Sequence, residues 1–136
     1  MDLVDAIKVS ASGMKAQGVR LRVISENLAN ANSLAETPGG DPYRRKMVSF
    51  KEVLDKSMGA RVVQVNKVDF DQSDFNKRYD PTHPAADKDG YVLTPNVNNL
   101  TEMMDMREAQ RSYSANLDML DSSKHMLERT IDLLRD

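Results

Sequence analysis

Residues 103–134 read MMDMREAQRSYSANLDMLDSSKHMLERTIDLL, and this stretch decides the fold. Apolar side chains recur in it at spacings of three and then four, with no Gly or Pro between them. A period of seven over this length predicts one long amphipathic helix that another helix must cover. Asn99 followed by Glu102 favours a capping box at its start, with Asn98 as the alternative N-cap. The repeat comprises Met103, Met106, Gln110, Tyr113, Leu117, Leu120, Lys124, Leu127, Ile131 and Leu134.

The amino-terminal end has a second repeat, with apolar positions spaced four and then three apart. It predicts a helix that begins at about Asp2, a good N-cap residue, and ends at about Asn30. Gly18 lies inside this helix in a column of small residues. It is either a tolerated glycine or part of a strip that a neighbouring backbone approaches closely. The repeat comprises Leu3, Ile7, Ser10, Met14, Gln17, Leu21, Ile24, Leu28 and Ala31.

The stretch between the two repeats lacks a helical period and is rich in turn formers and β-branched residues. Residues 60–70 alternate in part between apolar and polar side chains, which is typical of a strand. Residues 43–50 also predict a strand, and a short helical turn fits residues 51–58. We expect an extended, Pro-bearing loop over residues 71–90 and a short strand over residues 91–94.

These segments predict a mainly α fold. Its main feature is an antiparallel coiled-coil pair of long N- and C-terminal helices, joined by a small β-containing middle segment and extended loops. The expected divisions are residues 1–31 for the N-terminal helix, 32–98 for the middle segment and 99–136 for the C-terminal helix.

Aligning the two repeats in antiparallel order predicts one register for the helix pair. This register places Leu21 opposite Leu120 and brings the two ends of the chain together. It also sets Gln17 opposite Lys124. Polar residues inside a seam can fix the register of a coiled coil at a cost in stability.

One seam per helix leaves further apolar side chains uncovered, among them Met104, Met119 and Leu133. The chain has nine methionines, and their flexible thioethers suit a surface that meets several unlike partners. A two-helix hairpin that leaves this much apolar surface exposed buries that surface by associating with other chains. We therefore expect the isolated chain to have low helicity and to complete its folding against neighbours.

Composition narrows the classes of function. The charges nearly cancel at −2, so nothing draws the chain towards nucleic acid. Because cysteine is absent, disulfides, thiolate metal sites and thiol nucleophiles are excluded. No apolar run is long enough to span a bilayer, and no cleavable secretory signal is visible. These features alone predict a soluble cytoplasmic protein, unless export uses a signal that is not cleaved.

Catalytic chemistry is disfavoured because its parts are missing. The chain lacks paired zinc ligands, a nucleophile motif, a phosphate loop and a dinucleotide fingerprint. Residues 87–90 resemble part of a calcium loop, but the first carboxylate and the bidentate Glu are absent. A metal-assisted enzyme built from Asp80, His83 and Asp87 is the weakest interpretation, and we expect no cofactor. The basic triplet at residues 44–46 is interpreted as a solvated strand face.

Several segments together resemble one family. Residues 11–14 and 27–32 are similar to the amino-terminal signature of bacterial flagellar axial proteins, and residues 111–116 are similar to their carboxy-terminal motif. The middle narrows the resemblance to the flagellar basal-body rod protein family and, within it, to the proximal rod members. The middle segments that match are residues 42–46, 79–87, 90–92, 95–98 and 102–106.

This resemblance implies a structural subunit of the proximal rod, with no catalytic or metal site. The terminal helices would polymerise as an inner domain, transmit torque and line the export channel. The implied partners are other proximal and distal rod proteins, copies of the chain, the rod-to-membrane-ring adaptor protein and the inner-membrane ring. The chain would leave the cytoplasm through the flagellar type III export apparatus without a cleaved signal and reside in the basal body, in the rod that crosses the periplasm.

The resemblance also assigns packing and subunit-contact roles to the motif residues Asn27, Leu28, Asn30, Asn32, Arg111, Tyr113 and Asn116. The rival interpretation is a cytoplasmic coiled-coil adaptor or secretion chaperone, which would share the helical ends but would not need the middle segment. Together with apolar positions of the two repeats, the predicted interface residues are Leu3, Ile7, Met14, Leu21, Ile24, Asn27, Leu28, Asn30, Asn32, Met103, Met106, Arg111, Tyr113, Asn116, Leu117, Leu120, Leu127, Ile131 and Leu134.

Overall fold

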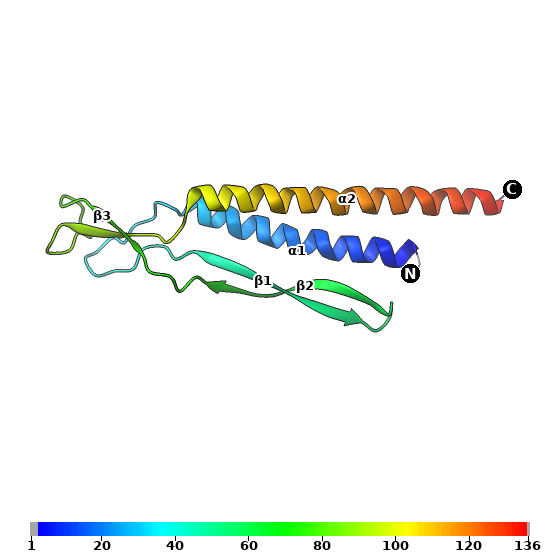
Figure 1. The fold of residues 1–136 in the computed structure, drawn as a ribbon, viewed down its shortest axis with the longest axis horizontal. Helices are drawn as coiled ribbons and strands as arrows, with labels where there is room; N and C mark the ends of the chain where they lie inside the picture. The colour runs from blue at the N-terminus through cyan, green and yellow to red at the C-terminus, as the bar shows by residue number, and fades with distance from the viewer. Residues whose placement is uncertain (1–2, 136) are drawn as a thin grey trace. The chain divides into compact units, whose positions relative to one another are not determined.

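The computed structural model describes residues 3–135 (Figure 1). Both predicted long helices are present: α1 spans Leu3–Ala29 and α2 spans Asn99–Arg135. The predicted N-cap residue Asp2 lies outside the described residues. Because the segment between the helices contributes only two small sheets, the fold is mainly α, as expected.

Four strands lie between the helices. The first sheet pairs β1 (Lys46–Asp55) with β2 (Ala60–Phe70), and the second pairs β3 (Asn76–Tyr79) antiparallel with β4 (Tyr91–Thr94). The strand predicted over residues 60–70 is confirmed. The prediction of a continuous loop over residues 71–90 is wrong in part, because β3 forms within it.

The helical turn predicted at residues 51–58 is wrong, since β1 continues to Asp55. The chain then turns back at once: the Asp55 carbonyl accepts hydrogen bonds from the amides of Met58 and Gly59. The Asp55 carboxylate accepts two more from Ser57, which lowers the pKa of Asp55. Gly59 has a φ of 63°, a conformation that a residue without Cβ adopts at little cost. These local bonds favour a tight hairpin over a helical turn.

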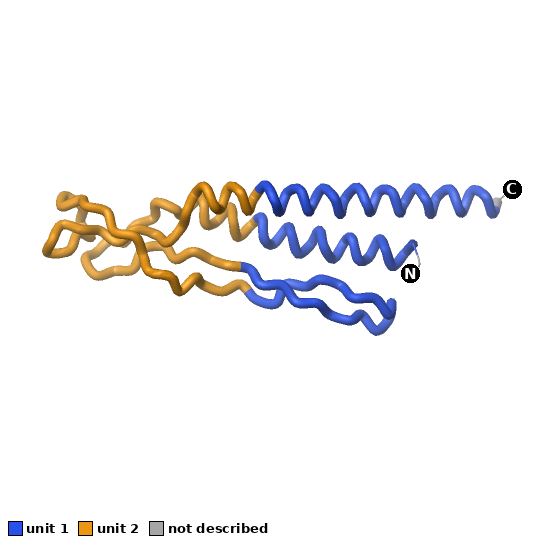
Figure 2. The backbone as a smooth tube through the Cα atoms, in the orientation of Figure 1, with its two compact units in different colours: residues 1–21, 48–67, 107–136 blue, residues 22–47, 68–106 orange. Residues whose placement is uncertain are grey.

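The chain divides into two compact units (Figure 2). Unit 1 comprises residues 1–21, 48–67 and 107–136, so it contains most of α1, of the β1–β2 hairpin and of α2. Unit 2 comprises residues 22–47 and 68–106, and it contains the end of α1, the start of α2 and the β3–β4 sheet.

The two cores differ in character. The fully buried side chains of unit 1 are small, and they belong to Ser10, Ala16, Val62, Ala109 and Ser123. The core of unit 2 contains Val23, Ile24, Ala85 and Val92, together with the polar residues Asn27 and Glu102. Unit 1 therefore holds its helices together through close approach of small residues, and unit 2 buries a polar network.

Within unit 1, α1 and α2 run antiparallel in a register that differs from the predicted one. The Arg20 guanidinium lies 3.7 Å from the Glu108 carboxylate, so the next residue, Leu21, cannot lie opposite Leu120. The offset is about twelve residues, or ~18 Å along a helix. The predicted pairing of Gln17 with Lys124 is also wrong, and Lys124 lies 3.9 Å from Glu128 on its own helix instead.

A close approach between the helices explains why this register is preferred. A Cβ added to Gly13 would lie 2.9 Å from the side chain of Asn116, so α2 passes close to α1 where α1 has no side chain. The close-approach strip suspected at Gly18 is in fact at Gly13, because no described atom lies within 4 Å of the corresponding position at Gly18.

Candidate functional site

Asn27 lies at the centre of a polar network in unit 2, and only 1% of its surface is exposed. Its Nδ2 donates to the Lys46 carbonyl at 2.9 Å and to Glu102 Oε2 at 3.1 Å. Its Oδ1 accepts from the Lys46 amide and from the Tyr43 hydroxyl, both at 2.9 Å. All donors and acceptors of the amide are thus used. Asn27 binds the Lys46 main chain as a neighbouring strand would, and so joins α1 to the start of β1.

Glu102 is the most deeply buried charge of this network, with no exposed surface. A buried carboxylate is tolerated only when it is paired and hydrogen-bonded. Arg45 Nε donates to Glu102 Oε1, and the same guanidinium lies 3.4 Å from Asp71 and 3.7 Å from Asp105. Burial of Arg45 disfavours its charge, but the bonds to Glu102 and Asp71 outweigh this and raise the pKa of Arg45.

Asn96 ties the loop after β2 to the same network. Its Oδ1 accepts from the Arg45 amide at 2.8 Å, and its Nδ2 donates to the carbonyls of Asp71 and Ser73. Hydrogen bonds from Ser73, and further from Arg45, lower the pKa of Asp71. Residues from α1, β1, the loop after β2 and the start of α2 therefore meet in one set of bonds.

An ion pair continues the network towards solvent. Lys46 Nζ lies 2.9 Å from Glu26 Oε2, and the two side chains are 33% and 40% exposed. The hydrogen bond and charge of Lys46 lower the pKa of Glu26, and those of Glu26 raise the pKa of Lys46. Because water reaches both groups, the pair contributes little to stability compared with the buried Arg45–Glu102 pair.

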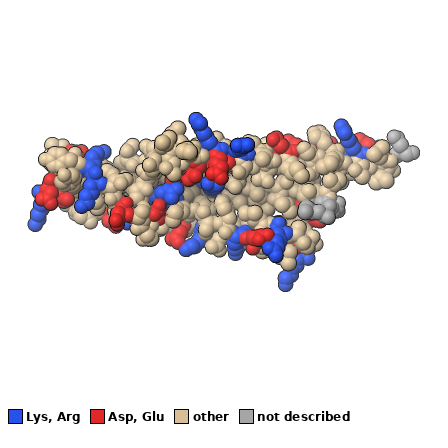
Figure 3. Space-filling model, in the orientation of Figure 1, with Lys and Arg blue, Asp and Glu red and all other residues tan. Residues whose placement is uncertain are grey.

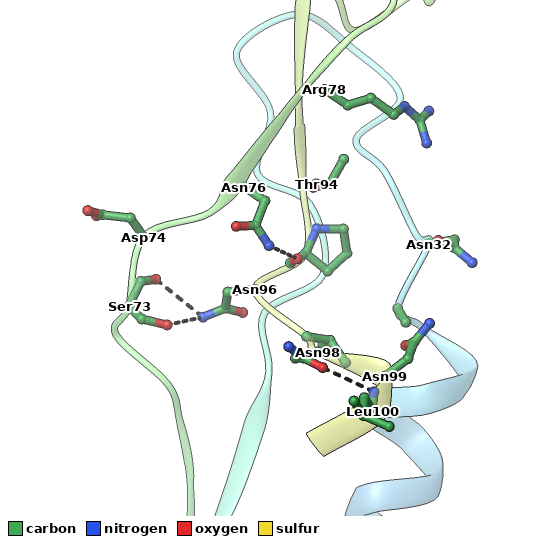
Figure 4. A pocket seen from close by; sticks show the side chains of 13 residues that line it. Asn32, Ser73, Asp74, Asn76, Arg78, Thr94, Asn96, Asn98, Asn99 and Leu100 are labelled. Atoms are coloured by element: carbon green, nitrogen blue, oxygen red, sulfur yellow. Dashed lines mark hydrogen bonds between the residues drawn. The ribbon is translucent and has the colours of Figure 1, made fainter. Parts of the chain in front are cut away.

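A polar pocket of about 610 Å³ lies beside this network in unit 2 (Figure 4). The start of α2 forms one wall, where Asn98 Oδ1 accepts from the amides of Leu100 and Thr101. Asn98 is therefore the N-cap, and the predicted capping box of Asn99 with Glu102 is wrong because Glu102 turns inward to Arg45. The other lining residues include Asn32, Ser73, Asp74, Asn76, Arg78, Thr94 and Asn96.

The acidic loop before β4 uses its side chains to stabilise turns. Asp80 accepts from the Thr82 hydroxyl, and Asp87 accepts from the amides of Asp89 and Tyr91. His83 Nδ1 accepts from the Ala85 amide at 3.0 Å. Among residues 3–135, no three His, Cys, Asp or Glu side chains are grouped as metal ligands. The side chains considered for a metal-assisted enzyme thus already serve the loop.

On α2, the face turned towards the chain's own interior is not the predicted apolar seam. Its most buried residues recur every seven positions at Glu102, Ala109 and Ser123. Asn116 occupies the same column and contacts α1 at Gly13. Small and polar side chains allow the close approach described above, so they occupy this face in place of the larger apolar ones.

The predicted seam of α2 lies beside this buried column and stays partly exposed. Exposed fractions are 51% for Met103, 40% for Leu117 and 50% for Ile131, and Leu134 reaches 82%. On the same helix Met106, Tyr113, Leu120 and Leu127 are half-buried. On α1 the predicted positions are more enclosed: Ile24 is buried, and Leu3, Ile7, Met14, Leu21 and Leu28 are half-buried.

The remaining motif residues occupy different surroundings. Asn30 Nδ2 donates to the Glu26 carbonyl and helps to end α1, whereas Asn32 is exposed at the polar pocket. Asn116 Nδ2 donates to the Ser112 carbonyl one turn earlier. Arg111 is exposed. Of the motif, only Asn27 reaches the buried network, and the structure does not bring all motif residues into one site.

The expectation of a solvated strand face at residues 44–46 is wrong for Arg45. Its side chain is only 21% exposed and contacts three carboxylates. Asn96 was likewise not singled out. The sequence contains one signal for a buried cation. Glu102 is an acidic residue beside an apolar repeat, and a carboxylate that is buried there requires a cationic partner.

Charges of both signs are interspersed with uncharged surface on the face drawn in Figure 3. No large field of one sign is seen on that face.

Within residues 3–135, neither helix combines the length and apolarity needed to cross a membrane.

Two family models match the ends of the chain. A model described as "Flagella basal body rod protein" matches residues 7–33, and one described as "Flagellar basal body rod FlgEFG protein C-terminal" matches residues 88–133. The flagellar basal-body rod protein FlgC of Agrobacterium fabrum is 52% identical over 130 residues, covering 96% of this chain and 94% of that protein. FlgC proteins of Bacillus subtilis and Salmonella typhimurium are 40% and 38% identical, and in each case at least 98% of both chains is covered.

Proposed function

This chain belongs to the flagellar basal-body rod protein family as a structural subunit of the proximal rod, and we propose that it polymerises through the exposed apolar faces of its terminal helices. It is located in the flagellar basal body and is not an enzyme. The interpretation as a cytoplasmic adaptor or chaperone finds no support among the relatives.

The observation that best supports the proposal is the apolar surface of α2. Met103, Leu117 and Ile131 are each at least 40% exposed, although their spacing is that of a packed seam. Because each is already about half covered, burying the rest of one such side chain stabilises an assembly by roughly half of the 1.5–3 kcal/mol that full burial contributes. Several of them together supply enough free energy to hold a subunit between neighbours, which is what a torque-bearing rod requires.

In this proposal the helices of neighbouring subunits complete coiled-coil packing around the export channel. Residues 1–31 and 99–136 form the inner domain, and residues 32–98 form the outer segment. The contact residues are those predicted from the repeats and motifs. The exposed ones, such as Leu117 and Ile131, meet neighbouring subunits, and the enclosed ones, such as Ile24, pack within the chain.

Assembly with other flagellar rod components and with copies of itself follows from the family. We further propose that the neighbours include proximal and distal rod proteins, the rod-to-membrane-ring adaptor protein and the inner-membrane ring. The chain would pass through the flagellar type III export apparatus without a cleaved signal and be built into the rod where it crosses the periplasm.

A charge placed in the exposed seam tests this function. Leu117→Glu would have to bury an unpaired carboxylate against a neighbour, so we expect its incorporation into basal bodies to fall at least tenfold, with loss of motility. The amount is measured by immunoblotting of purified basal bodies against whole-cell protein. Ser114→Glu, which adds the same charge at an exposed polar position of α2, is the matched control. Normal incorporation of Leu117→Glu would contradict the proposal.

A further inference from the structure

A groove in unit 1 runs between α1 and the β1–β2 hairpin. One hollow of about 530 Å³ is lined by Asp5 and Val9 of α1 and by residues 58–61. A second, of about 460 Å³, is lined by Ser12, Ala16 and their neighbours on α1 and by residues 62–65. Asp5, Val9, Ser12, Ala16 and Val19 are spaced four and three apart, so both hollows follow one face of α1.

Most of the uncharged lining residues are small or β-branched, so the groove has room for larger apolar side chains from outside. They include Val9, Ser12, Ala16 and Val19 of α1 and Gly59, Ala60 and Val62 of the hairpin. Lys15 lies at one hollow, and Arg61 at the other. Residues 5 to 19 extend over ~21 Å of helix, or about four turns. The groove is therefore long enough for two or three turns of a second helix.

The end of α2 in the same chain is a helical segment that is not packed against α1 in the described structure. Arg20 pairs with Glu108 and Gly13 lies against Asn116, so in this register the first described residue of α1, Leu3, lies level with about Met126. Beyond Met126, α2 has no described residue of α1 opposite it. Residues 127–135 therefore form an overhang, in which Ile131 is 50% exposed and Leu134 is 82% exposed.

We propose that the overhang of one copy, residues 127–135 of α2, binds in the groove between α1 and the β1–β2 hairpin of a second copy. Leu127, Ile131 and Leu134 form one stripe over ~10 Å of helix, which fits within the length of the groove. The carboxylates Glu128 and Asp132 beside this stripe, and the negative end of the helix, are complementary to Lys15, whereas Arg61 already pairs with Glu52 of its own hairpin.

This contact rests on the proposed rod function, and it would join copies of the chain head to tail. Overhang and groove are different surfaces of one chain, so the contact is heterologous, and repeating it from copy to copy produces a ring or an open helical polymer. A few side chains bury less surface than a stable two-protein interface requires. The contact therefore holds only in combination with other rod contacts, so single subunits stay apart before assembly.

Cysteine crosslinking tests the contact, because the chain has no cysteine of its own. Basal bodies are purified from cells that produce the double variant Ser12→Cys with Leu134→Cys and are treated with a short bis-maleimide. We expect a crosslinked species of two copies, which neither single variant gives. A link within one chain is excluded by distance, because Leu134 lies ~25 Å along α2 from the residue opposite Ser12.

Ser114→Cys with Leu134→Cys is the matched control pair, since Ser114 is exposed on α2 outside the groove, and we expect no two-copy species from it. Val19→Cys with Leu127→Cys repeats the test at a second point of the groove, because both pairs of positions are seven residues apart. Crosslinking only to a different rod protein, or no crosslinking by either pair in basal bodies that contain the variants, would overturn the proposal. Absence of the wild-type chain from basal bodies would instead refute the rod function.

Discussion

At the scale of single residues, the network around Asn27 and Glu102 determines where the middle segment begins. Asn27 uses every hydrogen-bonding group, and Glu102 shares the Arg45 guanidinium with Asp71. Removing one partner of a buried pair leaves the other charge uncompensated, which costs more than the pair contributes. We therefore expect this network, and not the helix seam, to be the point of unit 2 that is most sensitive to mutation.

Glu102→Gln tests this sensitivity. The substitution leaves the Arg45 charge without its closest partner, and we expect unit 2 to lose about 3 kcal/mol of stability. The Lys46 amide, which donates to Asn27, would then exchange with solvent on the order of 100-fold faster, as measured by hydrogen exchange. Glu108→Gln removes a carboxylate that is 67% exposed, and it should change the rate by less than about threefold. Equal effects of the two substitutions would contradict the role of the network.

The pH dependence of unit 2 follows from the same groups. The pKa values of Asp71 and Glu26 are lowered in the folded chain, so their contribution is present above pH ~4 and is lost as the pH falls through the folded values. The pKa of Lys46 is raised, so its contribution persists until the pH rises above ~10.5. We expect protection of the Lys46 amide, corrected for intrinsic exchange, to be constant between pH ~5 and ~9 and to fall below pH ~4. Asp71→Asn should reduce this acid sensitivity, and an unchanged acid profile would argue against it.

At the scale of elements, the two helices and the strand over residues 60–70 could be predicted because each depends on a local pattern. The face that α2 turns inward could not be predicted. Periodicity favours Met103 and Leu117 for that face, but contact depends on how closely the helix backbones approach, and small residues set that distance. The offset of the register has the same cause, since the Asn116 side chain lies against α1 at Gly13, where α1 has no Cβ.

The candidate site was predictable only in part. Asn27 was identified from a motif, but its partners Lys46 and Glu102 are distant in sequence and meet it only through the fold. The expectation for Arg45 failed because a basic triplet on a strand gives no sign of which side chain turns inward. Likewise β3 is short and polar, and it forms because β4 provides its hydrogen-bonding partner.

The two glycines of α1 offer a matched test of the close approach. Gly18→Ala has open space in the described structure and replaces a poor helix former, so we expect the helix to gain up to ~1 kcal/mol. Gly13→Ala gains the same propensity but places Cβ 2.9 Å from the Asn116 amide, so the Asn116 side chain must turn away and give up its hydrogen bond to the Ser112 carbonyl. Basal bodies purified from cells that produce each variant should contain at least the normal amount of Gly18→Ala and less Gly13→Ala, as measured by immunoblotting. Normal amounts of both would show that the helices do not meet closely at Gly13.

At the scale of the whole molecule, the chain leaves exposed the apolar side chains that a stable monomer would bury. Unit 1 has a core of small residues, and Met103, Leu117, Ile131 and Leu134 remain exposed. An exposed apolar surface of this kind marks a site of association. In a rod subunit this arrangement couples folding to assembly, because the helices gain their cover only from adjacent subunits.

Amide hydrogen exchange of the purified, unassembled chain tests this coupling most directly. We expect fast exchange along α2 beyond Arg107 and along the first turns of α1, low helicity at both ends, and protection confined to the network around Asn27 and Glu102. Slow exchange along the full length of both helices, with a single cooperative melting transition of the monomer, would contradict it.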